Sequence, residues 1–213
     1  MRKILALLSL MLFTTAAAAE PLRITVFGDS LVQGYGLPQG QGLVPQLERW
    51  LNENGAEVQL QNAGVSGETT AGGAARVAWT LSDAPDGLIV LLGGNDMLRG
   101  LPPAEARANL ADILEQAADS GIETLLVGMQ APGNYGPEYK AEFDSIYPGL
   151  ASRFDVGLYP DAFGGIAAKV NGDITAAQVY FQPDGIHPNA EGVALNVAAL
   201  GPAALKLVAR IQN

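Results

Sequence analysis

Short apolar segments alternate with longer segments of helical periodicity along this chain, and this alternation constrains the fold more than any other feature. Segments with the character of strands lie at residues 22–27, 58–61, 88–92, 124–128 and 156–159. The third and fourth are almost continuous apolar runs, which is typical of strands covered by helices on both faces. Strands that alternate with helices predict an α/β protein with a parallel sheet and right-handed crossovers.

Five segments with helical spacing lie between or after these strands, at residues 42–54, 70–82, 103–120, 141–153 and 191–211. The third shows an apolar stripe along one side, made of Ala106, Leu110, Ile113, Leu114 and Ala117. Pro103 suits the first turn of this helix, and Gly121 suits the position after its end. The sequence therefore predicts a three-layer α/β domain, with helices on both faces of the sheet.

The first 19 residues have the order of a secretory signal peptide. Arg2 and Lys3 form a basic start, residues 4–13 are almost wholly apolar, and residues 17–19 are alanines suited to cleavage. The apolar run spans about ten residues, whereas a membrane-spanning helix needs roughly 20; the alternative is a buried first helix. We predict a signal peptide at 1–19, a single domain at 20–213, and an exported protein that is periplasmic or secreted.

Charge and cysteine content exclude several partners. The chain has no cysteine, so it has no disulfide, no thiol nucleophile and no N-terminal cysteine for a lipid anchor. Without residues 1–19 it would hold 22 acidic and 10 basic residues, a net charge of −12. Because an acidic surface repels phosphate backbones and no basic run follows the signal, we expect no nucleic-acid binding. Because there is no cysteine for a lipid anchor and the apolar run of the signal is too short to span a membrane, we also expect no stable membrane anchor.

Three polar or glycine-rich turns follow the first three predicted strands. They are Gly28-Asp29-Ser30, Asn62-Ala63-Gly64 and Gly93-Gly94-Asn95-Asp96. In open parallel sheets, ligands bind outside the carboxyl ends of the strands. We therefore expect these three turns to converge on one rim of the sheet.

His187 is the only histidine in the chain. Imidazole is the side chain best suited to move protons near neutral pH without special tuning. A serine hydroxyl attacks poorly unless such a base lies beside it, and Ser30 is the best candidate for the hydroxyl. The chain contains no Gly-x-Ser-x-Gly motif, so it does not use the nucleophile elbow of the α/β-hydrolase fold.

The segment Asp184-Gly185-Ile186-His187-Pro188 also offers a partner for the imidazole. Asp184 can fix the tautomer of His187 if Gly185 lets the chain fold back, and Pro188 favours an extended conformation at His187. The alternative for each segment taken alone is structural. Asp29 or Ser30 would then cap a helix, and His187 would cap the helix near Asn189.

Oxyanion stabilisation would complete such a site. Acyl transfer develops negative charge on the carbonyl oxygen, and each preorganised donor there contributes a few kcal/mol, roughly 3–4 in measured cases. The Asn95 amide and the backbone N–H groups of Gly64 and Ser30 are candidate donors. Taken alone, Gly93-Gly94-Asn95-Asp96 is better explained as an ordinary turn or helix cap.

These blocks together resemble the SGNH (GDSL-type) hydrolases over nearly the whole chain after the signal. The four ordered blocks are Gly28-Asp29-Ser30-Leu31, Asn62 to Gly67 with Gly64, Gly93-Gly94-Asn95-Asp96, and Asp184 to Pro188. Within the family, the chain is most similar to the bacterial thioesterase I / protease I / lysophospholipase group, also called arylesterases. The features that carry this similarity are Gly67-Glu68-Thr69-Thr70, Met97-Leu98-Arg99, Asn134-Tyr135-Gly136 and the export signal.

The resemblance implies a flavodoxin-like fold with a five-stranded parallel sheet, and no cofactor. It implies Ser30 as the nucleophile, Asp184 and His187 as its triad partners, and Ser30, Gly64 and Asn95 as oxyanion donors. The implied activity is hydrolysis of acyl or aryl esters, acyl thioesters and lysophospholipids through an acyl-enzyme. The partner is a small-molecule ester or thioester.

The predicted substrate channel is apolar. Its candidate lining residues lie beside the blocks named above and are Met97, Leu98, Leu101, Tyr135 and Ile186. The alternative is that these side chains only pack loops onto the core.

Three other functions stay open at this stage. The chain could be an exported carbohydrate-acetyl esterase or a binding protein that holds a small ligand without turning it over. A metal hydrolase is disfavoured, because only Asp29, Asp96, Asp184 and His187 are available as ligands, a poor set for zinc; we therefore predict no metal. The sequence does not indicate the oligomeric state.

Overall fold

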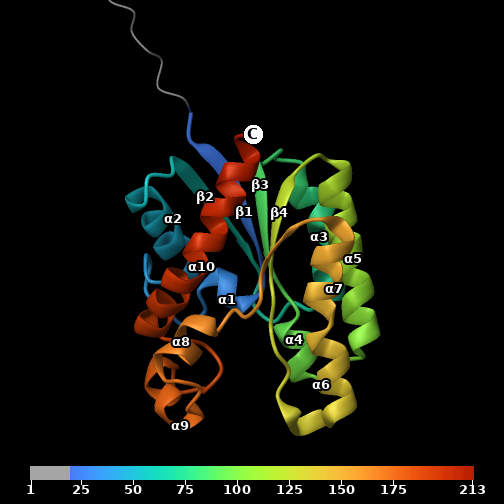
Figure 1. Ribbon diagram of the computed structural model, residues 1–213, viewed down its shortest axis with the longest axis vertical. Coiled ribbons are helices and arrows are strands. Elements are labelled where there is room, and N and C mark those ends of the chain that lie inside the picture. The colour runs from blue at the N-terminus through green and yellow to red at the C-terminus, as the bar shows by residue number, and fades with distance from the viewer. Residues whose placement is uncertain (1–19) are drawn as a thin grey trace, which may run out of the picture.

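The computed structural model describes residues 20–213, and the predicted signal peptide lies outside these described residues. Five strands form one parallel sheet in the order β2-β1-β3-β4-β5 (Figure 1). They are β1 (Leu22–Gly28), β2 (Val58–Gly64), β3 (Gly87–Leu91), β4 (Glu123–Val127) and β5 (Gly157–Tyr159). The predicted fold class is therefore confirmed.

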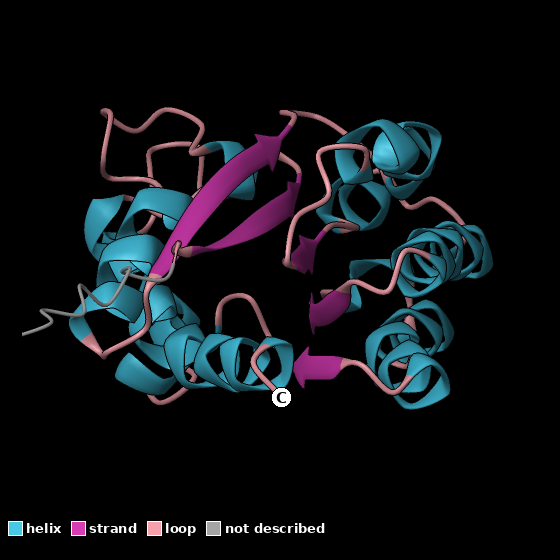
Figure 2. Cartoon of the chain, turned by 90° about the horizontal axis from the view of Figure 1, so that it is seen from above, coloured by secondary structure: helices cyan, strands magenta, loops and turns pink. Residues whose placement is uncertain are grey.

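Helices cover both faces of the sheet, and Figure 2 shows them in two groups with the strands between. One group consists of α2 (Leu43–Glu53) and α10 (Ala190–Ile211), and the other of α3 (Thr70–Leu81), α5 (Pro103–Asp119) and α7 (Ile146–Phe154). Shorter elements lie toward the carboxyl ends of the strands: α1 (Ser30–Gln33), α4 (Gly94–Leu98), η1 (Gly133–Tyr135), α6 (Pro137–Asp144), α8 (Gly164–Lys169), α9 (Ile174–Ala177) and η2 (Gln178–Tyr180).

The core lies on both sides of β3. Leu88, Ile89 and Val90 are fully buried, as their continuous apolar run predicts. Helix α10 is long and apolar enough to cross a membrane by length and composition, but half of its most apolar stretch is buried inside the fold. It packs on α2, α8 and the sheet, so in this structure it serves as a core helix.

The predicted helix at 141–153 is wrong in one respect, because two helices occupy this region. Helix α6 starts earlier, at Pro137, and α7 begins at Ile146 after a break at Ser145. Pro148 has no N–H, so it cannot donate the hydrogen bond that would carry α6 onward across the break. At the break, the Ser145 hydroxyl donates to the carbonyl of Glu142 (2.7 Å). Proline is tolerated in the first turn of the new helix.

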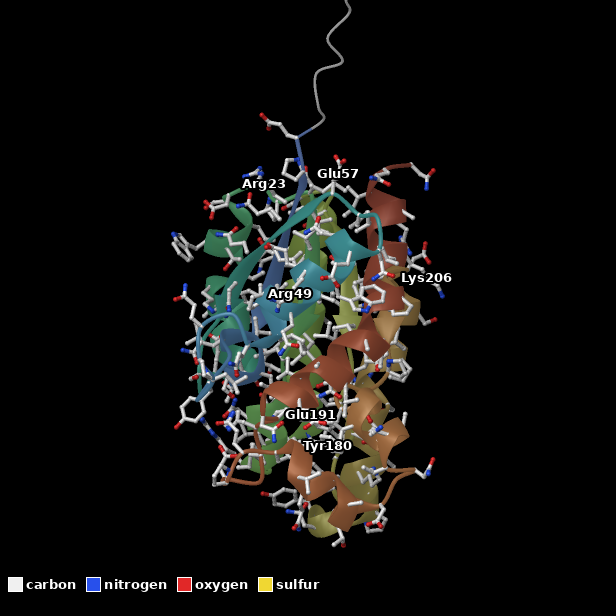
Figure 3. The ribbon with its side chains drawn as sticks, turned by 90° about the vertical axis from the view of Figure 1, so that its left-hand side faces the viewer. Arg23, Arg49, Glu57, Tyr180, Glu191 and Lys206 are labelled. Atoms are coloured by element: carbon white, nitrogen blue, oxygen red, sulfur yellow. The ribbon has the colours of Figure 1, made fainter. Side chains whose placement is uncertain are left out.

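The strand register places the ends of β1, β2 and β3, and the predicted turns that follow them, side by side at one edge of the sheet. Gly28 at the end of β1 pairs with Gly64 on one side and with Leu91 on the other. In Figure 3, Arg23 and Glu57 mark the opposite end of the sheet from Tyr180. Because the three strands end together, the segments that follow them form a common rim at the end where Tyr180 lies.

Candidate active site

Ser30, His187 and Asp184 form a continuous hydrogen-bonded chain at this rim. The Nε2 atom of His187 lies 2.8 Å from the Oγ atom of Ser30, and its Nδ1 atom lies 2.7 Å from Oδ2 of Asp184. Ser30 is the first residue of α1, whereas the other two residues lie in the loop before α10. The fold therefore joins segments that are 157 residues apart in the sequence.

The loop from Asp184 to His187 folds back on itself. Oδ1 of Asp184 accepts the backbone N–H groups of Ile186 (2.9 Å) and His187 (3.0 Å), and Gly185 supplies the positive φ of 68° that this turn needs. The hydrogen bond from the His187 ring and then that from Ile186 lower the pKa of Asp184 to about 2. Asp184 is therefore an anionic acceptor for the imidazole throughout the neutral range.

A second set of contacts ties this loop to the nucleophile segment. The Tyr35 ring lies 4.7 Å from the His187 ring, centroid to centroid, at 37°. The Gln182 amide donates to the carbonyls of Tyr35 (2.8 Å) and Pro188 (3.1 Å). These contacts hold the imidazole against the segment that carries Ser30.

The turn before Ser30 is sterically tight. A Cβ atom at Gly28 would lie 2.0 Å from the carbonyl oxygen of Leu91, so no other residue fits there without moving the neighbouring strand. Asp29 then caps α1, because its Oδ1 atom accepts the N–H of Leu31 (3.0 Å). Helix capping, the structural alternative for this turn, thus applies to Asp29, while the neighbouring Ser30 hydroxyl contacts His187.

Asn95 lies beside the same carboxylate. Its Nδ2 atom donates to Oδ2 of Asp29 over 3.3 Å. Gly93 has a φ of 120°, and Gly94 packs so closely that a Cβ atom there would lie 3.2 Å from Asp29. Because an amide nitrogen carries two hydrogens, Asn95 can donate to Asp29 and to a second acceptor at once.

Gly64 lies close to the site, but its N–H already donates a hydrogen bond within its own turn. Its N–H donates to Oδ1 of Asn62 (3.0 Å), and a Cβ atom at Gly64 would meet the backbone of Gln33 at 2.2 Å. Gly64 is therefore packed directly against α1. In this structure the N–H predicted to stabilise an oxyanion is bound to Asn62.

Arg76 of α3 joins the ends of β1 and β2 beneath these turns. Its guanidinium donates to the carbonyls of Gly28 (3.2 Å) and Ala63 (2.9 Å), and its Nε atom lies 2.7 Å from Oε1 of Glu68. It also lies over the Phe27 ring, 4.0 Å from the centroid. Sequence reasoning missed this residue, because nothing in the local pattern marks it.

A cavity of about 430 Å³ opens over Ser30, His187 and Asn95. Of the predicted substrate-binding residues, Met97, Leu98 and Ile186 line it. Among the lining residues that were not predicted, four lie outside the recognisable blocks: Tyr35, Met129, Phe163 and Phe181. No local signal could have found them.

The other two predicted substrate-binding residues, Leu101 and Tyr135, are not among the residues that line this cavity. The Tyr135 hydroxyl donates to the carbonyl of Leu98 (3.0 Å), and the Leu101 carbonyl accepts from Tyr139 (3.1 Å). Both residues therefore brace the α4 segment.

The described residues 20–213 contain no group of three or more histidine, aspartate or glutamate side chains that could hold a metal ion. Asp96, one of the four candidate ligands, accepts hydrogen bonds from the N–H (2.8 Å) and hydroxyl (2.6 Å) of Thr70. Its carboxylate fixes the start of α3.

Asp29 gives the site a pH-dependent stability. Burial raises the pKa of Asp29 from 3.8 to about 6, against the lowering effect of its hydrogen bonds from Leu31 and Asn95. Because the folded-state pKa exceeds the unfolded value, the free energy of unfolding falls as the pH rises from about 4 to about 6. The difference between these two pKa values corresponds to a loss of about 3 kcal/mol in the free energy of unfolding once Asp29 is ionised.

We therefore expect Asp29→Asn to raise the free energy of unfolding by about 1–3 kcal/mol at pH 8, with the gain shrinking toward pH 4.5. Urea unfolding of both proteins at the two pH values measures this difference. Asp184, with its pKa near 2, stays ionised over this window and does not contribute to it. An equal difference at both pH values would contradict the raised pKa of Asp29.

A hydroxyl, an imidazole and a carboxylate linked in series, beside an amide donor on the rim of a parallel sheet, define the class of serine hydrolases. The position of the serine at the end of β1, without a nucleophile elbow, separates this site from that of the α/β-hydrolase fold.

Comparison with known proteins agrees with this class. The GDSL-like lipase/acylhydrolase family matches residues 26–195. Esterase TesA of Pseudomonas aeruginosa is 39% identical over 182 residues, 85% of this chain and 86% of the relative. Thioesterase 1/protease 1/lysophospholipase L1 of Escherichia coli K12 is 36% identical over 176 residues, 82% and 78% of the two chains.

A solved structure supports the same assignment. The crystal structure of a protein named TesA superposes with a TM-score of 0.78 at 34% identity, covering 87% of this chain and 99% of the other. The chain thus belongs to the GDSL-like lipase/acylhydrolase family, and the resemblance seen in its sequence is confirmed. It is an enzyme of the esterase and thioesterase type.

Proposed function

We propose that Ser30 attacks the carbonyl carbon of a carboxylic ester and forms an acyl-enzyme. His187 takes the hydroxyl proton through Nε2 and gives it to the leaving oxygen, and Asp184 stabilises the imidazolium that forms between these steps. In the second step His187 activates a water molecule, which releases the acid. The single observation that carries this proposal is the unbroken chain Ser30–His187–Asp184, with contacts of 2.8 and 2.7 Å.

The proposed oxyanion donors are Asn95 and the backbone N–H groups of Ser30 and Gly64. Ser30 is the first helical residue of α1, and intrahelical bonding leaves the N–H groups of a first turn without partners. Asn95 is aligned by Asp29. The Gly64 N–H can take part only after it leaves Asn62, so we assign it a secondary role.

We propose small acyl or aryl esters as the substrate class, with acyl thioesters and lysophospholipids as further substrates. The apolar walls formed by Met97, Leu98 and Ile186 support this choice over sugar acetates, whose hydroxyl groups need polar partners. The names of the relatives, which include thioesterase and lysophospholipase, support it independently. We also propose that the enzyme is exported, to the periplasm or the medium, after cleavage of its signal peptide near Ala19.

Titration with a p-nitrophenyl alkylphosphonate tests the proposal directly. We expect release of one equivalent of p-nitrophenol per enzyme, complete loss of activity, and a mass increase on the peptide that contains Ser30. A Ser66→Ala variant is the matched control, because Ser66 lines the same cavity but its hydroxyl donates to Gln33 (2.7 Å). Labelling of Ser66, or no labelling at all, would refute Ser30 as the nucleophile.

A further inference from the structure

A second cavity, of about 760 Å³, adjoins the catalytic one and is lined by residues of α8, α9 and η2. We call it the α8–α9 groove. Its apolar lining residues include Phe163, Ile166, Val170, Ile174, Ala177 and Phe181. Phe163, Phe181 and Gly185 also line the catalytic cavity, so the two spaces share a wall and lie next to each other.

Few polar side chains line the groove, so it suits an apolar ligand. Asp173 is one of three polar side chains in its lining, and its carboxylate caps α9 by accepting the N–H groups of Thr175 (2.9 Å) and Ala176 (3.2 Å). Gln182 is a second, and its amide donates to backbone carbonyls. Ile174 is nevertheless 83% exposed, which leaves a large apolar side chain facing solvent at this wall.

The position of the groove determines which part of a substrate it faces. Gly185 and Gln182, which flank the loop that carries His187, form part of its wall. Asn95, Met97 and Leu98 belong to α4, and Figure 1 shows α4 and α6 on one side of the rim and α8 and α9 on the other. The groove therefore opens on the imidazole side of the site.

We infer that the α8–α9 groove binds the alcohol side of the ester, and that it favours a hydrocarbon chain or ring over the polar glycerophosphate alcohol of a lysophospholipid. The inference rests on the proposed function, in which His187 protonates the leaving oxygen as the bond between that oxygen and the acyl carbon breaks. The substituent on the leaving oxygen must then lie beside the imidazole, while the carbonyl oxygen points toward Asn95. A thiol leaving group would occupy the same groove.

Two ester series distinguish the two sides of the substrate. The first holds the acyl group constant as acetate and lengthens the alcohol from ethyl to octyl, and the second holds the alcohol constant as ethyl and lengthens the acyl chain. For wild type, we expect kcat/KM to rise along the first series, by up to roughly fourfold for each methylene that is buried. A flat response in the first series, with short esters still hydrolysed, would overturn the inference.

Two neighbouring alanines supply a matched pair of variants. Ala177 lines the groove, whereas Ala176 is exposed on the same helix and is not among the lining residues. We expect Ala177→Trp to fill the groove and to lower kcat/KM for octyl acetate by about tenfold or more. Its kcat/KM for ethyl acetate and ethyl octanoate should stay within about twofold of wild type, as should every value for Ala176→Trp.

A second pair of variants tests the groove without introducing a bulky tryptophan, which could distort the structure locally. Ile174→Asp places a charge in the groove wall, and Val179→Asp places one at an exposed apolar residue outside the lining. We expect only the former to weaken octyl acetate hydrolysis. If the groove variants lower ethyl octanoate hydrolysis instead, the groove holds the acyl chain and our assignment is wrong. Failure of the proposed function is a separate result, in which Ser30→Ala retains hydrolysis of ethyl acetate.

Discussion

Ser30→Ala is expected to lower kcat for p-nitrophenyl acetate by about 10⁴-fold or more, because the variant has no hydroxyl for His187 to activate. In a serine protease with the same three groups, loss of the nucleophile costs roughly 10⁶-fold, and donors to the oxyanion supply the residual rate. The Ser30 side chain is small and its Oγ atom contacts His187 at the cavity. The fold should therefore survive, with a free energy of unfolding within about 1 kcal/mol of wild type.

Steady-state kinetics together with urea unfolding test this expectation. His187→Ala and the double variant provide the control: groups that act as a unit are not additive, so the double variant should be about as slow as Ser30→Ala alone. If the two losses multiply, Ser30 and His187 do not act in one step. Turnover by Ser30→Ala near the wild-type rate would remove the mechanism altogether.

Arg76→Met is expected to cost about 3–5 kcal/mol of unfolding free energy, the largest stability effect that we predict. The substitution leaves Glu68, whose side chain is only 9% exposed, as a buried anion without its cation. It also removes the donor to the carbonyls of Gly28 and Ala63, which directly precede Asp29 and Gly64. A drop in kcat should accompany the loss of stability, because the turn that carries Ser30 loses its support.

Arg210→Met is the comparison for this prediction. Arg210 pairs with Glu123, but both side chains are about two-fifths exposed, so we expect a cost of about 0–1 kcal/mol. Replacing Glu68 by leucine in the Arg76→Met background should restore most of the stability, since no buried charge remains, without restoring kcat. A cost below about 1 kcal/mol for Arg76→Met would show that Glu68 is solvated or paired elsewhere.

Sequence patterns predicted the sheet well because its central strands are buried on both faces. Strand β3 was expected at 88–92 and occupies Gly87–Leu91, and α5 was expected at 103–120 and occupies Pro103–Asp119. Helices α1, α4, α8 and α9 have only four to six residues, which is too short to establish a periodic apolar pattern. Strand order depends on packing between distant segments, so the local pattern does not contain it.

The blocks around Ser30, Asn95 and His187 were recognisable because each combines a special backbone conformation with a reactive side chain. The walls of the substrate cavities were recognised only in part, through Met97, Leu98 and Ile186. Phe163 and Phe181 reach the cavity from loops around short helices, and Arg76 supports the strand ends behind it from an otherwise ordinary helix. Their contribution depends on which segments the fold brings together, and a pattern of neighbours in the sequence does not carry that information.

Asp184 and His187 lie three positions apart and are joined both by their side chains and by the backbone of their own turn. Ser30 reaches them only across the tertiary structure. An opening of the segment before α10 would thus withdraw proton acceptor and counter-charge together as a preassembled pair, leaving the hydroxyl chemically inert rather than half-activated. Reclosure would return the acceptor and the counter-charge to the hydroxyl together, in one step.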